Sequence, residues 1–243
     1  MVSFALRENL PIDNIKATLL LSQKVKEIEE QYIFQNTNDL SSAHKAYSLS
    51  SIYTLVGFLE SSINDLYANA KDNVEYLKGI EKHIEKLASF DWRIFRNKLD
   101  KQINDNSESN IIRKYQFALQ LLEVPFIDPE DKTLKDIILL IKIRNYFTHH
   151  FATWIKCDSD VQSEYYILKN RFEENPIYKG KTNPFFPDKL LGYGFLQWAL
   201  DLSIKFVKYF YDIIGLQYFF IKQLESILEE NNKNNSHINL KRT

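Results

Sequence analysis

The chain contains very little cysteine, glycine or proline. Its 243 residues include one cysteine, Cys157, and six residues each of glycine and proline. A single cysteine excludes an internal disulfide bond and a zinc site built from several cysteines. Glycine and proline together usually make up about 12% of a globular chain, and a sequence so poor in turn residues argues against a sandwich or barrel of many short strands.

Two further absences limit the class of protein. No run approaches the roughly 18 apolar residues of a transmembrane helix, since the densest run, 137–141, ends at Lys142. The first residues show no basic segment followed by an apolar stretch, so we expect no signal peptide. The formal net charge is −1, so any contact with nucleic acid must come from a local patch. We therefore expect a reduced, soluble protein of the cytoplasm that has no contact with a membrane.

Helical periodicity runs through most of the chain. Apolar residues recur at intervals of three and four, and they predict helices over residues 12–34, 41–71, 74–88, 111–122, 134–154, 190–214 and 216–229. The first two of these predict a long helical hairpin. The stripe of Phe195, Trp198, Phe206 and Phe210 has the spacing of a buried helix face, so we interpret it as core.

Two segments fall outside the helical pattern. Residues 158–188 are interrupted by prolines and a glycine, and they predict a short helix followed by an irregular insertion before the C-terminal helices. Residues 231–243 are polar and predict a disordered tail. We therefore predict an all-α helical bundle that forms a single domain over residues 1–230.

One helix carries an unusual set of polar residues. The stretch from Asp136 to Trp154 reads DIILLIKIRNYFTHHFATW, and its first half is apolar on nearly every side. Burying the arginine, asparagine and histidines of its second half without partners would cost several kcal/mol, so these groups are either paired inside the fold or open onto a cleft. Asn145 and His149 are four apart and share a face. Arg144 is five positions from His149, about 140° round an ideal helix, and a shared site needs either a curled side chain or a bent helix.

These residue types can move a proton and hold a phosphate. Histidine titrates near neutral pH and can act as base or acid, arginine offers a permanent planar charge for a phosphate, and asparagine can hold either group in register. Glu60 and Asn64 are also four apart, on the helix predicted over 41–71. The carboxylate of Glu60 can pair with Arg144 and orient it, or both Glu60 and Asn64 face water.

The segment from Arg144 to His149 resembles the R-polar-x3-H signature of the HEPN (higher eukaryotes and prokaryotes nucleotide-binding) superfamily. The stretch FLESSINDLY also resembles the long helix that packs beside the motif in such domains. The resemblance implies a helical bundle, a metal-independent endoribonuclease without a cofactor, and products that carry a 2′,3′-cyclic phosphate. It assigns catalysis to Arg144, Asn145 and His149, with support from Thr148 and His150. His150 is also an alternative catalyst, because histidines at both spacings from the arginine occur in the family. It further implies RNA as partner, a homodimer with two motifs facing one cleft, and a role in toxin–antitoxin systems or anti-phage defence with an antitoxin protein.

Other residues are weaker candidates. Contact with RNA phosphates is possible for Arg93 and Arg96 in one cationic segment and for Lys169 and Arg171 in the insertion. A solvated helix face explains the first pair, and loop packing explains the second pair equally well. His44, His83 and His237 stand in no motif. Paired carboxylates and glycine-rich phosphate loops are absent from the sequence, which argues against a glycosidase or a P-loop enzyme.

Two alternatives to the enzyme stay open. The first is a non-catalytic HEPN-like helical module for protein–protein or nucleotide binding, in which the motif is kept for structure. The second is a structural oligomer in which Arg144 is buried in an internal ion pair and His149 is sealed from solvent.

Overall fold

The computed structural model describes residues 9–35, 41–72, 77, 81–89, 110–149, 164–216 and 222–230. These residues form helices, turns and loops, and no strand occurs among them. The all-α prediction is therefore confirmed. The long helices are α1 (Leu10–Gln35), α2 (Ser41–Lys71), α3 (Glu81–Ala88), α5 (Asn110–Leu121), α6 (Lys132–His149) and α7 (Tyr193–Ile213). A further helical stretch covers residues 222–230, while the predicted tail at 231–243 lies outside the described residues.

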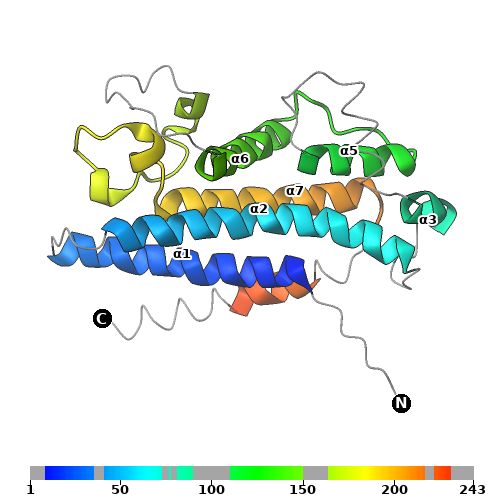
Figure 1. Ribbon diagram of the computed structural model, residues 1–243, viewed down its shortest axis with the longest axis horizontal. Helices are drawn as coiled ribbons and strands as arrows, with labels where there is room; N and C mark the ends of the chain where they lie inside the picture. The colour runs from blue at the N-terminus through cyan, green and yellow to red at the C-terminus, as the bar shows by residue number, and fades with distance from the viewer. Residues whose placement is uncertain are drawn as a thin grey trace, which may run out of the picture.

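The predicted hairpin is formed by α1 and α2, which lie side by side along the bundle (Figure 1). Apolar residues such as Ile15 and Ile52 are fully buried in it. Polar contacts also cross between the two helices, because Thr18 Oγ1 and Thr54 Oγ1 are 2.8 Å apart. Each hydroxyl also lies within hydrogen-bonding distance of a carbonyl of its own helix, Asn14 for Thr18 and Ser51 for Thr54, so the pair adds a polar link between the two helices.

Helix α7 lies behind α2 and carries the aromatic core (Figure 1). Phe195, Phe206 and Phe210 have no exposed surface, so the interpretation as core is confirmed for these three residues, whereas Trp198 of the same stripe is half-buried. The ring of Tyr115 from α5 meets Phe206 and Phe210 edge to face, at centroid distances of 5.0 and 4.7 Å. Edge-to-face pairs of this kind stabilise a core beyond the area that they bury.

Helices α5 and α6 cover the side of α2 and α7 that faces away from α1 (Figure 1). Ile137, Leu140 and Ile143 of α6 are fully buried. The sequence predicted a start at residue 134, but α6 begins at Lys132, and the carboxylate of Asp131 accepts a hydrogen bond from the Leu134 amide at 2.9 Å. Asp131 is therefore the N-cap.

The described part of the insertion consists of three short helical turns joined by loops, whereas the sequence predicted one short helix followed by an irregular stretch. They are η4 (Glu164–Leu168), η5 (Pro176–Tyr178) and η6 (Phe185–Lys189). Asn175 is buried among them, where its amide nitrogen donates to the carbonyls of Leu191 (2.8 Å) and Asp188 (3.2 Å). Its side-chain oxygen accepts from the Ile177 amide at 3.0 Å, so this one side chain holds the insertion against the start of α7.

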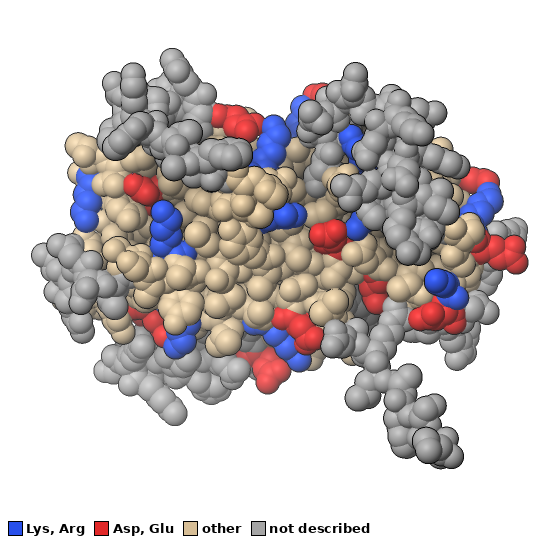
Figure 2. Space-filling view, in the orientation of Figure 1, with Lys and Arg blue, Asp and Glu red and all other residues tan. Residues whose placement is uncertain are grey.

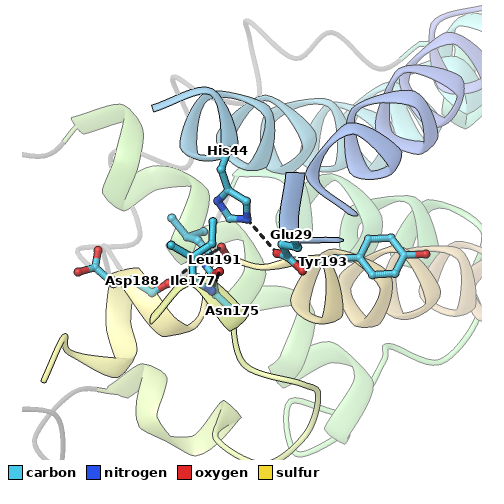
Figure 3. A network of polar contacts seen from close by, with 7 residues as sticks. All are labelled: Glu29, His44, Asn175, Ile177, Asp188, Leu191 and Tyr193. Carbon is cyan, nitrogen blue, oxygen red and sulfur yellow. Dashed lines mark hydrogen bonds and ion pairs between the residues drawn. The ribbon is translucent and has the colours of Figure 1, made fainter. Parts of the chain in front are cut away.

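A buried carboxylate joins three parts of the chain beside this insertion. Figure 3 shows Glu29 of α1 between His44 of α2 and Tyr193, the first residue of α7. Glu29 Oε1 lies 2.8 Å from His44 Nε2 and accepts the Tyr193 amide at 2.8 Å. Gly192, at the N-cap of α7, offers no side chain for this amide. The carboxylate of Glu29 replaces the missing cap, and its negative charge suits the positive end of the helix.

Candidate functional site

The motif residues lie on the last two turns of α6. Arg144, Asn145 and His149 are all on this one continuous helix. His149 is exposed, and Arg144 and Asn145 are half-buried. The arrangement in which His149 is sealed inside the bundle is therefore not the one observed.

Arg144 occupies the inward-facing side of α6. The residues one and two turns before it on the same side, Ile137, Leu140 and Ile141, are all at most 1% exposed. The Nε of Arg144 is shielded from solvent, and the guanidinium has no hydrogen-bond or ion-pair partner within the part of the chain that the structure describes. A partly buried cation without an anion is costly, and such a group requires an explanation.

Asn145 and His149 occupy another side of the helix. Asn145 is three residues after the exposed Lys142, and His149 is four residues after Asn145, so the three side chains share the side of α6 that faces solvent. Since α6 is helical through His149, the Arg144 and His149 side chains leave its axis about 140° apart. Thr148 is exposed, and its hydroxyl donates to the Arg144 carbonyl at 2.9 Å. Within the described residues this contact stays inside the helix, and the supporting role of Thr148 remains a prediction.

The partner expected for Arg144 belongs to another cation. Lys114 of α5 is buried, and its Nζ lies 2.9 Å from Glu60 Oε1 and 2.9 Å from Asn64 Oδ1. The prediction that Glu60 pairs with Arg144 is therefore wrong, and so is the alternative that Glu60 and Asn64 only face water. The sequence held a clue, because Lys114 stands within the apolar stripe of α5, between Ile111 and Ala118.

The insertion packs through aromatic rings against the C-terminal half of α6. The Phe186 ring lies 4.7 Å from that of Tyr146 and 4.1 Å from that of Tyr165, measured between centroids. Burial raises the pKa of Tyr165 to about 12. Lys142 also forms an ion pair with Glu164 at 2.8 Å. These contacts place the insertion directly beside the turn of α6 that carries Arg144 and Asn145.

The two cations proposed for RNA in the insertion have internal partners. Arg171 Nη1 is 2.7 Å from Asp136 Oδ1, in a pair whose side chains are 25% and 12% exposed. Lys169 donates to the Tyr166 hydroxyl at 2.9 Å and lies over its ring. Both contacts favour loop packing over a free RNA-binding surface. Arg93, Arg96 and His150 lie outside the described residues.

The charge pattern shows no dominant field on the visible face. Figure 2 shows basic and acidic side chains of the described residues interspersed over uncharged surface. Within the described ranges, no three His, Cys, Asp or Glu side chains are grouped so that they could hold a metal ion. Nor does any helix in those ranges combine the length and apolar character needed to cross a membrane.

Comparison of the chain with protein-family models, with curated proteins and with solved structures finds no match. The candidate site is consequently defined by its residues and their surroundings alone.

Proposed function

We propose that this protein is a metal-independent endoribonuclease of the HEPN type. The observation that carries the proposal is the guanidinium of Arg144, which is half-buried on the inward side of α6 and has no anionic partner among the described residues. An RNA phosphate would supply the missing negative charge in the geometry that guanidinium prefers. His149 is exposed and lies five residues after Arg144, and its imidazole can move a proton.

The chemistry assigns one task to each group. His149 removes the proton of the ribose 2′-hydroxyl or delivers one to the leaving 5′-oxygen. Arg144 binds the phosphate while negative charge develops on it, and Asn145, one turn before His149, holds the imidazole in register. The products are a 2′,3′-cyclic phosphate and a free 5′-hydroxyl.

The arrangement on α6 favours a site built from two chains. Arg144 and His149 leave the helix about 140° apart, so a single straight helix does not bring them together easily. In a homodimer, the exposed His149 of one chain can approach the phosphate held by Arg144 of its partner. An antitoxin protein that covers this site would control the activity, which fits a role in toxin–antitoxin systems or phage defence.

The experiment is an RNA cleavage assay with purified protein in EDTA. We expect cleavage by the unmodified protein and its loss in both Arg144→Ala and His149→Ala. Lys142→Ala is a matched control, because it removes an exposed cation from the same helix and should leave cleavage unchanged. If the folded, unmodified protein cleaves no RNA, or if cleavage survives both substitutions, the non-catalytic module replaces the enzyme as the better explanation.

A further inference from the structure

A groove that the ribonuclease proposal does not use lies between α1, the insertion and the first turns of α7. Its volume is about 850 Å³. The lining residues come from α1 (including Lys26 and Glu30), from residues 170–179 of the insertion, and from α7 (including Tyr193). Pockets that bind ligands commonly have volumes of about 300–1,000 Å³, so this groove can hold several side chains at once.

Aromatic rings form one wall of the groove. Phe172 and Trp198 line it together, with their ring centroids 5.7 Å apart, and both are half-buried. Trp198 stacks in turn on the buried Phe195 at 5.8 Å. The Nζ of Lys26 already lies 5.4 Å from the centroid of the Tyr193 ring. The groove therefore has aromatic rings in its wall, and such rings attract cations over their faces through a negative electrostatic potential.

The lining of the groove also includes three carboxylates. Glu173, Glu174 and Asp201 all line the groove, and within the described part of the chain none of them has a hydrogen-bond or ion-pair partner. Burial raises the pKa of the Asp201 carboxyl. The pKa of Tyr193 is also raised, first by burial and then by nearby carboxylates that include Asp201. Negative charge thus accumulates in the groove.

The cations of the groove do not balance this charge. Arg171 is paired with Asp136 at 2.7 Å, and Lys26 lies 4.0 Å from Glu30. Lys179 is exposed and is the remaining lysine of the lining. An RNA strand would meet repulsion between its phosphates and the carboxylates, so the electrostatics favour a positively charged occupant.

We propose that this groove binds a basic peptide segment of a partner protein, with arginine or lysine side chains placed on Phe172 and Trp198 and paired with Glu173, Glu174 and Asp201. A peptide fits better than a single small cation, because the volume accommodates several side chains and Glu173 and Asp201 are exposed at the rim. The proposal does not depend on Arg144 or on ribonuclease activity, so the two proposals succeed or fail separately.

The test measures fluorescence anisotropy of a labelled peptide of alternating arginine and glycine, with a glutamate–glycine peptide as its counterpart. We expect saturable binding of the basic peptide only, and binding that weakens as salt is added. The double variant Glu173→Gln, Asp201→Asn should weaken binding about tenfold. The double variant Glu229→Gln, Glu230→Gln removes the same charge at exposed sites outside the groove and should stay within about twofold of the unmodified protein.

A second pair of variants separates the aromatic contact from the charge. Trp198→Phe should retain most of the affinity, whereas Trp198→Leu should lose several-fold, with circular dichroism used to verify that both are folded. The proposal is overturned if the basic peptide fails to saturate the protein, or if the control double variant weakens binding as much as the groove variant. Equal affinity for free spermidine also overturns it, because the groove would then be a polyamine site.

Discussion

Removal of the Glu29 carboxylate is expected to destabilise the protein severely. In Glu29→Ala, His44 loses its 2.8 Å partner and the Tyr193 amide loses its 2.8 Å acceptor. His44 is 2% exposed and Glu29 is 8% exposed, so water does not readily replace either contact. Leaving a buried hydrogen-bonding group without its partner costs about 1–3 kcal/mol, and losing a helix cap costs about 0.5–2 kcal/mol.

These contributions overlap, because one oxygen of Glu29 makes both contacts, so we expect a total loss of about 3 kcal/mol. A domain is stable by about 5–15 kcal/mol, and the variant should therefore unfold at a much lower urea concentration. Glu29→Gln keeps an acceptor oxygen for both contacts but loses the charge. It should cost only about 1–2 kcal/mol.

The assay is urea unfolding followed by circular dichroism for Glu29→Ala, His44→Ala and the double variant. The structure predicts that the double variant loses clearly less stability than the sum of the two single variants, because either substitution alone already breaks the pair. A loss below about 1 kcal/mol in Glu29→Ala, or full additivity in the double variant, would refute the reasoning. Limited proteolysis of residues 164–192 provides a second measurement, since the network anchors the insertion.

Three further outcomes follow from the surroundings of single residues. A Cβ at Gly194 would lie 2.5 Å from the Glu173 carbonyl oxygen, so Gly194→Ala should cost about 1–3 kcal/mol in urea unfolding; Gly57→Ala, which meets only the side chain of Asn14 at 3.2 Å, is the matched control and should be close to neutral. Burial raises the pKa of Tyr165 to about 12, and an unfolded tyrosine ionises near pH 10. The contribution of Tyr165 to the free energy of unfolding is therefore complete below about pH 10 and is lost as the pH rises to about 12. In Tyr165→Phe, the free energy of unfolding should fall less across this pH range. Burial also raises the pKa of Asp201, so its ionised form opposes folding. Asp201→Asn should raise the melting temperature at neutral pH and have no such effect below about pH 3.9, where aspartate is protonated in both states.

The local pattern of the sequence was enough to predict the helices and the core. Apolar spacing placed helices close to the observed bounds of α1, α2, α5 and α7. It also identified the stripe of Phe195, Phe206 and Phe210 as buried. Such predictions succeed because a helix face is set by residues three and four apart, and these are neighbours in any fold that contains the helix.

The motif on α6 was also visible in the sequence, including the angle between Arg144 and His149. Whether Arg144 had an internal partner was not visible. Glu60 was a reasonable candidate by type and position, yet its carboxylate contacts Lys114, which is 54 positions away in the chain. Spacing within one helix defines which residues share a face, but only the packing of α2 against α5 decided which cation the carboxylate meets.

Long-range contacts account for what the sequence did not reveal. His44 stood in no motif, although it is buried against Glu29, which also accepts the amide of Tyr193 from 164 positions away. The groove likewise combines residues of α1, the insertion and α7. Local periodicity therefore determined the helices and the residues that could do chemistry. The tertiary structure alone decided their partners, because the free energy of a buried charge depends on groups that chain folding, and not sequence proximity, brings within hydrogen-bonding distance.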